Sequence, residues 1–190
     1  MNKTIYLNRL LILILPLLLN SCVTMSGKSP DEKRQTILDM KTQVLNELYK
    51  TKPKVKSQIA NAPGYAVFSN ANVYALFISI GGGYGVVVNN ETGKNTYMNM
   101  GEAGVGFGLG AKDFRMIFVF HDAATMNDFI EKGWDFGGQA DAAAKASDKG
   151  AALGGEISIN NVSIYQLTET GLAIQATVKG TKYWKADELN

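Results

Sequence analysis

Apolar residues recur every three or four positions over residues 37–48, with polar residues between them. This spacing predicts an amphipathic helix that buries one face. Ser29 as the N-cap, Pro30 at the first helical position and Glu32 in a capping box mark its start. The helix is predicted to end near residue 50, because Pro53 cannot continue it.

Two shorter helices are predicted further along the chain. The first covers residues 54–60. The second covers residues 122–132, with Asp122 as its N-cap and Gly133 at its end.

From Gly64 onward the chain is rich in glycine, aromatic and β-branched residues, the composition of antiparallel strands. Strands are predicted over residues 65–69, 73–80, 84–89, 94–99, 103–111, 114–120, 134–138, 152–159, 162–167 and 172–178. Hairpin turns are predicted at 89–93 and 168–171. The alanine-rich residues 139–150 fit either a helix or a strand. Because strands outnumber helices without regular alternation, we expect an α+β domain. It has a curved, mainly antiparallel β-sheet or partial barrel packed by an N-terminal helix and a middle helix.

The N-terminus has the anatomy of an export signal. Lys3 and Arg9 lie before an apolar stretch at residues 10–19, which is short for a transmembrane helix. The stretch ends in Leu19-Asn20-Ser21-Cys22, which resembles a bacterial lipoprotein signal. We therefore expect a signal peptide at residues 1–21, lipid attachment at Cys22 and a tether at residues 22–29. The alternative is ordinary secretion, with Cys22 as an incidental thiol.

The residue after Cys22 indicates in which membrane of the cell envelope a lipoprotein is placed. Val23 stands there rather than aspartate, which by resemblance to enterobacterial sorting signals favours the outer membrane. The prediction is a lipid-anchored protein of the cell envelope, at the periplasmic face of the outer membrane. A lipoprotein modification adds several acyl chains, so Cys22 alone would hold the protein on the membrane.

Charge excludes one class of function. Removing residues 1–21 takes away two of the 19 basic residues and none of the 17 acidic ones, which leaves the mature chain near neutrality. A nucleic-acid-binding protein needs a basic surface, so no nucleic-acid partner is expected. Residues 22–60 carry a net positive charge and residues 61–190 a matching negative one, so the basic end is the one nearest Cys22 in sequence.

The strongest candidate for lipid contact is a lysine cluster formed by Lys50, Lys52, Lys54 and Lys56. Four ammonium groups so close together would attract the headgroups of anionic phospholipids. The alternative is a solvated junction between two helices.

Two glycine-rich segments, residues 81–85 and 101–111, raise the question of nucleotide binding. Gly106, Gly108 and Ala111 match a weak dinucleotide fingerprint. That motif needs a helix to follow it, whereas another strand is predicted here. We therefore interpret the glycines as architecture, because a glycine face lets a strand bend or another backbone approach closely. No cofactor is predicted.

Catalytic chemistry is sparse. His121 is the only histidine, and it is better explained as a loop residue beside the helix cap. Glu102 and Asp113 could meet as paired carboxylates, but acids on neighbouring strands are usually solvated. Zinc-site and nucleophile-elbow motifs do not occur. We predict no catalytic residues, no metal site and no enzymatic activity.

Several segments together resemble the SYLF domain. They are residues 62–68, residues 81–85, residues 101–111 followed by the apolar residues 116–120, residues 164–165 and residues 170–173. The resemblance spans about residues 35–184. It implies a lipid-binding module, which here would cover residues 30–190. In eukaryotic members it implies phosphoinositide recognition helped by a basic amphipathic N-terminal helix, and in some of them actin binding.

These observations predict a membrane-anchored envelope lipoprotein whose domain binds lipid or a membrane surface. The alternative is a structural or interaction protein of the periplasm that binds a protein partner through its sheet. An apolar cavity would favour the first function, and a flat exposed apolar patch would favour the second.

Overall fold

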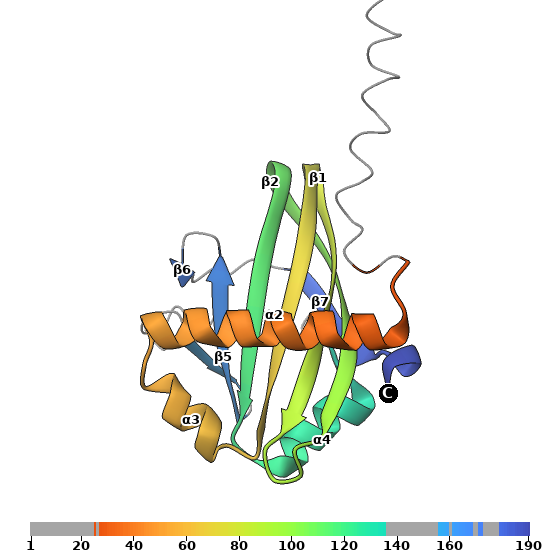
Figure 1. Cartoon of the computed structure of the whole chain (residues 1–190). Coiled ribbons are helices and arrows are strands. Elements are labelled where there is room, and N and C mark those ends of the chain that lie inside the picture. Colours follow the sequence, from red (N-terminus) through yellow and green to blue (C-terminus); the bar gives the residue numbers. More distant parts are fainter. Residues whose placement is uncertain (1–24, 26, 136–155, 160, 169–170, 173–178) are drawn as a thin grey trace, which may run out of the picture.

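The computed structural model describes residues 25, 27–135, 156–159, 161–168, 171–172 and 179–190 (Figure 1). Its helices are α2 (Pro30–Thr51), α3 (Val55–Asn61), α4 (Ala123–Lys132) and the short 3-10 helix η2 (Asp187–Leu189). Its strands are β1 (Gly64–Asn89), β2 (Asn95–Phe120), β3 (Trp134–Asp135), β4 (Glu156–Ile159), β5 (Val162–Thr168), β6 (Gly171–Leu172) and β7 (Lys179–Lys185). Cys22 and residues 139–150 lie outside the described residues.

The three predicted helices are confirmed. Ser29 and Glu32 form the capping box of α2, in which the Ser29 N–H donates to Glu32 Oε2 at 2.8 Å and the Glu32 N–H to Ser29 Oγ at 3.3 Å. Asp122 caps α4 by accepting from the Thr125 N–H at 2.7 Å. This hydrogen bond keeps the pKa of the Asp122 carboxyl below its ordinary value. Local capping signals therefore fix where α2 and α4 begin, whereas α3 has no side-chain cap.

The strands are longer than predicted. Six separate strands were expected between residues 65 and 120, whereas β1 and β2 are continuous and pair in antiparallel register from Gly64↔Phe120 to Val88↔Asn95. The glycines do not interrupt the ladder, since Gly82 pairs with Gly101. One register shift lies between Leu76 and Ile78. The predicted breaks fell at glycines 81–83 and at polar residues such as 70–72 and 112–113, but neither kind of residue removes the backbone hydrogen bonds of a ladder.

The described strands form one antiparallel sheet in the order β3-β7-β2-β5-β4, with β1 also on β2 and β6 on β5. β2 is long enough to pair with β7 along residues 98–104 and with β5 along residues 115–120. Strand β7 was not predicted. The expected fold class is confirmed: the sheet is curved and not closed, and helices pack on both of its faces (Figure 1).

The two halves of β1 fold back against each other, as the bent β1–β2 hairpin in Figure 1 shows. A Cβ placed on Gly85 would overlap both the carbonyl oxygen of Val67 and the Phe68 ring. A Cβ on Gly83 would likewise overlap the Ser69 carbonyl oxygen. These glycines allow a close approach of backbone that a side chain would block.

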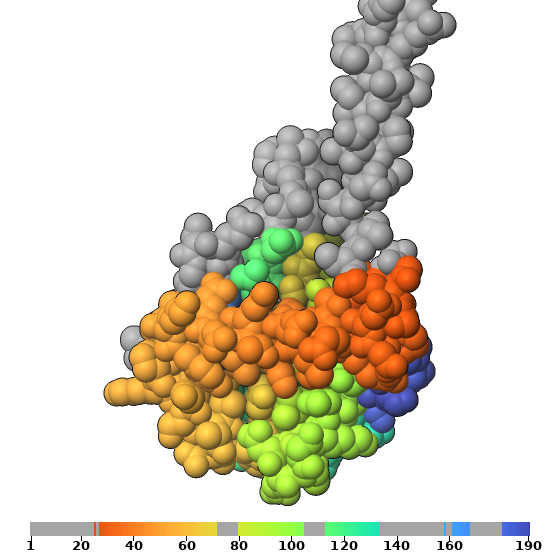
Figure 2. Space-filling model, in the orientation of Figure 1, coloured from red at the N-terminus to blue at the C-terminus, as the bar shows by residue number. Residues whose placement is uncertain are grey.

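Each face of the sheet carries a hydrophobic core. The first core lies under α2, α3 and η2 and includes Ile37, Leu48, Val67, Ile117 and Leu189. The second core packs against α4, and four of its aromatic rings, from Phe68, Phe118, Phe129 and Tyr183, have centroids 4.7–6.1 Å apart. In Figure 2, α2 runs across the front of the molecule and α3 lies at its left, while yellow-green strand residues remain visible below α2.

The last residue ties η2 to the sheet. Asn190 Oδ1 accepts from the Tyr97 N–H at 2.9 Å, and Asn190 Nδ2 donates to the carbonyl oxygens of Tyr97 and Ala186 at 2.8 and 2.9 Å. Arg34 on α2 adds a hydrogen bond from Nε to the Leu189 carbonyl oxygen at 2.9 Å. η2 is therefore held between the sheet and the start of α2.

Candidate functional site

The lysine cluster predicted from sequence lies at the junction of α2 and α3. Lys50, Lys54 and Lys56 are exposed. Lys52 is half-buried, and its Nζ lies 5.2 Å from the centroid of the Tyr165 ring, a cation–π distance. The junction therefore presents three exposed ammonium groups, and the fourth packs on the fold.

The lysine cluster is far from the tether, although it is close in sequence. Helix α2 has 22 residues, which makes it about 33 Å long. The tether residue Met25 packs on the first core five residues before α2 begins, whereas Lys50 lies in the last turn of α2 and the other three lysines follow it, at the opposite end of the helix in Figure 1. The first turn of α2 is acidic, with Asp31 and Glu32 exposed. The lysine cluster thus lies at the end of α2 opposite Met25, while the start of the helix mixes these acids with Lys33 and Arg34.

His121 belongs to a chain of hydrogen bonds that joins α3 to β5. Tyr165 Oη donates to Gln58 Oε1 at 2.6 Å, Gln58 Nε2 donates to Ser163 Oγ at 3.1 Å, and Ser163 Oγ lies 2.9 Å from His121 Nε2. A serine beside a histidine can be a nucleophile and its base. Ser163 is only 2% exposed, however, so a substrate would not reach its hydroxyl. The chain is better explained as the polar support that docks α3.

Replacing Gln58 with methionine is expected to lower the free energy of unfolding by about 2 kcal/mol, because buried Ser163 and Tyr165 both lose a hydrogen-bond partner. Urea unfolding followed by circular dichroism measures this loss. Ser57→Ala is the matched control, since Ser57 is exposed on the same helix. Equal stability of the two variants would contradict a supporting role for Gln58.

Glu102 and Asp113 do not form a carboxylate pair. Side chains alternate between the two faces of a strand. Glu102 therefore shares its face with Met100 in the second core, and Asp113 shares its face with Ile117 in the first core. Glu102 Oε2 accepts from Asn70 Nδ2 at 3.1 Å. The two carboxyl groups lie on opposite faces of the sheet.

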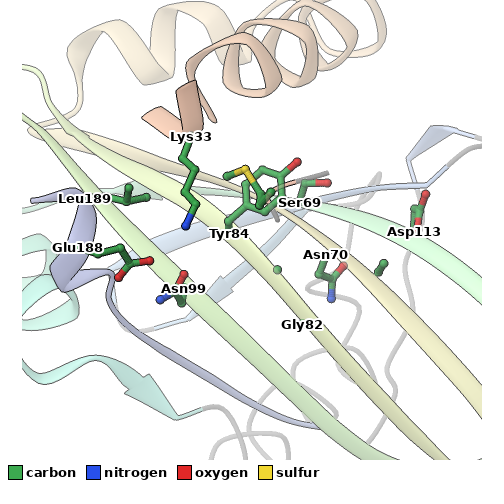
Figure 3. A pocket seen from close by; sticks show the side chains of 12 residues that line it. Lys33, Ser69, Asn70, Gly82, Tyr84, Asn99, Asp113, Glu188 and Leu189 are labelled. Carbon is green, nitrogen blue, oxygen red and sulfur yellow. The ribbon is translucent and has the colours of Figure 1, made fainter. Parts of the chain in front are cut away.

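The described residues also enclose a pocket of about 570 Å³ that sequence reasoning missed. It lies between the start of α2, η2 and the sheet. In Figure 3, the Lys33 side chain descends from α2 toward the carboxylate of Glu188 on η2 and the amide of Asn99 on β2. Tyr84 and Ser69 line the pocket from β1. Its volume is in the range of small-molecule sites.

No sequence motif could have identified this pocket. Lys33, Tyr84, Asn99 and Glu188 come from four separate segments, and only the folded-back hairpin and the docked η2 bring them together. A scan for spacing along the chain cannot detect such a set. Its lining mixes apolar residues such as Met25 and Leu189 with the charged side chains of Lys33, Asp113 and Glu188, so it is not a purely apolar cavity of the kind that would favour an acyl chain.

The described part of the chain shows neither a metal-ion cluster nor a membrane-spanning helix. Its His, Cys, Asp and Glu side chains nowhere gather in threes that could hold a metal ion. Within the same residues, no helix is both long and apolar enough to cross a membrane.

Comparisons with known proteins give one informative relative. No protein-family model matches the chain. The chain is 33% identical over 165 residues to Beta cell expansion factor A from Aeromonas veronii, a match that covers 87% of this chain and 62% of that protein. This chain is therefore a homologue of Beta cell expansion factor A over most of its own length, and it spans less than two thirds of that protein.

Proposed function

We propose that this protein is a membrane-anchored envelope lipoprotein with a SYLF-like domain that binds a membrane surface. Three sequence features support the anchor: the basic start, the apolar stretch and the single cysteine at position 22. The observation that carries the membrane contact is the exposure of Lys50, Lys54 and Lys56 around one helix junction. The expected partner is therefore anionic phospholipid.

The lysines suit recognition rather than attachment. Each ammonium group near an anionic surface contributes about 1 kcal/mol, so three contribute about 3 kcal/mol. Such binding is weak and weakened further by salt. Attachment would come from the acyl chains on Cys22.

The geometry restricts how the domain sits on the bilayer. Cys22 is three residues before Met25, so the lipid lies within about 11 Å of the start of the fold. The lysines lie about 33 Å further along α2. The lipid and the lysines can touch one bilayer when α2 lies roughly parallel to the membrane plane. The anchor then keeps the lysines at a high effective concentration near the headgroups, which compensates for the weakness of each contact.

A second candidate function is binding of a protein partner in the periplasm through the sheet. The observation that favours it is the exposure of Ile80 at 65% and Trp184 at 43%, both on strands of the sheet. A contact surface needs exposed apolar side chains, and these two are the large ones found exposed among the described residues. The name of the Aeromonas relative describes an effect on beta cells and specifies no ligand, so it favours neither candidate.

Vesicle flotation tests the proposed function. Residues 23–190 are mixed with phosphatidylcholine vesicles that contain or lack phosphatidylglycerol, at low and high salt. Reversing the charge of Lys50, Lys54 and Lys56 to glutamate is expected to weaken binding to the anionic vesicles on the order of 100-fold, because three favourable contacts of about 1 kcal/mol are lost.

The matched control reverses Lys94, Lys132 and Lys182, three exposed lysines outside the junction. It changes the net charge by the same amount and is expected to keep most of the binding. Equal binding by the two triple variants would remove the junction as the membrane contact. Absence of vesicle binding by the unmodified domain would favour the protein-partner function.

A further inference from the structure

The pocket between α2, η2 and the sheet combines groups of different hydrogen-bonding character. Lys33 only donates, and the carboxylates of Glu188 and Asp113 only accept. Asn99 and Tyr84 can both donate and accept. A ligand that fits such a lining must itself offer donors and acceptors close together, which is the property of neighbouring hydroxyl groups.

The charges of the lining argue for a neutral ligand. One ammonium group stands against two carboxylates in the described lining, and Glu188 lies beside Lys33 in Figure 3. An anion drawn to Lys33 would be repelled by Glu188, and a cation drawn to Glu188 would be repelled by Lys33. Neither kind of ion finds a cluster of opposite charge there.

One aromatic ring lines the pocket and a second, that of Trp184, lies near one of its lining residues without lining it. Tyr84 lines the pocket directly. The Trp184 ring lies over Gly101, where a Cβ would meet it at 3.3 Å, and Gly101 is in register with the lining residue Gly82. Trp184 is 43% exposed, so part of its ring is open to solvent. An exposed aromatic face next to polar groups can bind a ligand ring whose C–H face packs on the aromatic ring while the polar substituents at its edge form hydrogen bonds.

The wall that carries Glu188 is fixed in place. Glu188 belongs to η2, which the three hydrogen bonds of Asn190 and the Arg34 contact hold to the sheet and to α2. A preorganised wall loses little conformational entropy when a ligand binds.

We propose that this pocket binds a neutral polyhydroxylated ligand of the saccharide class. Its hydroxyl groups accept from Lys33 and donate to Glu188 and Asn99, while the C–H face of a sugar ring covers the aromatic rings. The sugar could belong to a soluble glycan or to the headgroup of a glycolipid, since both present the same chemistry. This site is separate from the lysine cluster and independent of the proposed function.

Isothermal titration calorimetry on the mature chain, residues 22–190, tests the proposal. The protein is kept in lauryldimethylamine oxide, because a detergent with a sugar headgroup would compete. Cellotriose, maltotriose and chitotriose are the neutral probes, and inorganic phosphate is the anionic comparison. Binding of at least one trisaccharide is expected, with phosphate inactive.

Two variants assign the binding to this pocket. Asn99→Ala and Glu188→Gln are each expected to weaken it about tenfold, which is the effect of losing one good hydrogen bond. Asp187→Asn is the matched control for Glu188→Gln, since Asp187 is the exposed neighbour on η2 and does not line the pocket. It is expected to bind like the unmodified protein. The Lys50, Lys54 and Lys56 reversal should also leave sugar binding unchanged, which separates this proposal from membrane binding.

A second arm separates the two sources of the sugar. Phosphatidylcholine vesicles with and without glucosyl diacylglycerol are floated with the same variants. Binding that needs the glycolipid and is lost in Glu188→Gln supports the headgroup as the source, and trisaccharide binding supports a soluble glycan. The proposal is overturned if neither probe binds, if phosphate binds in place of the sugars, or if both pocket variants bind like the unmodified protein.

Discussion

Replacing Gly85 with alanine is expected to lower the free energy of unfolding by about 3 kcal/mol, at the upper end of overpacking effects. The new methyl group would overlap the Val67 carbonyl oxygen and crowd the Phe68 ring, where the two halves of β1 meet. A backbone oxygen cannot move aside as a flexible side chain can. Urea unfolding monitored by circular dichroism gives the change directly.

The control for this prediction is a glycine three residues away. A Cβ on Gly82 would come no closer than 3.9 Å to the Met100 carbonyl oxygen, so Gly82→Ala meets no obstacle. It is expected to leave stability unchanged or to raise it by about 0.5 kcal/mol, because alanine restricts the unfolded chain more than glycine does. Similar stability of the two variants would mean that the halves of β1 are not in close contact.

Replacing Cys22 with alanine is expected to move nearly all of the protein from the membrane fraction to the soluble fraction of the envelope. The thiol is the proposed attachment point, and each buried methylene of an acyl chain contributes about 0.8 kcal/mol to membrane binding. The remaining lysine contacts, about 1 kcal/mol each, are too weak to hold the domain in physiological salt. Fractionation followed by immunoblotting checks the shift.

Ser26→Ala, four residues further along the tether, is the control and is expected to remain with the membranes. Mass spectrometry of the unmodified protein should show acyl chains on Cys22. If Cys22→Ala stays with washed membranes, lipid attachment at this residue is not what anchors the protein. If the unmodified protein carries a free thiol, the ordinary secretion alternative holds.

Local signals in the sequence were sufficient to place the starts of α2 and α4. Ser29 and Glu32 specify the start of α2 through hydrogen bonds between residues three positions apart, and Asp122 does the same for α4. Such contacts need no tertiary context. The turn after β1 is also local, because Asn89 Oδ1 accepts from the backbone N–H groups of Glu91 and Thr92.

The sheet could be predicted in kind but not in extent. Gly82 and Gly101 look like strand ends, yet they pair with each other inside one long ladder. What keeps them in the sheet is the register of the flanking residues, which a local pattern does not reveal. β7 was missed because residues 179–185 are mostly polar or charged, and their place in the sheet comes from pairing with β2.

Of the two candidate sites, one could be predicted from the sequence and the other could not. The lysine cluster could be found from sequence because four lysines fall within seven residues, although its distance from the anchor depends on the length of α2. The pocket could not be found, because Lys33, Asn99 and Glu188 meet only after η2 docks at the end of the chain. Residues that meet through tertiary structure leave no mark in the spacing of a single sequence.

The long β1–β2 ladder also has a consequence for how the chain folds. Val88 and Asn95 are neighbours across a short turn, whereas Gly64 and Phe120 lie at the two extremes of the hairpin. Closing the turn first costs little loop entropy, and each further pair then forms beside one already made. The pairs of the ladder are therefore expected to form in sequence, starting next to the Asn89 turn and ending at Gly64 and Phe120. The strand halves that pack on each other through Gly85 come together late, after most of the ladder is in register.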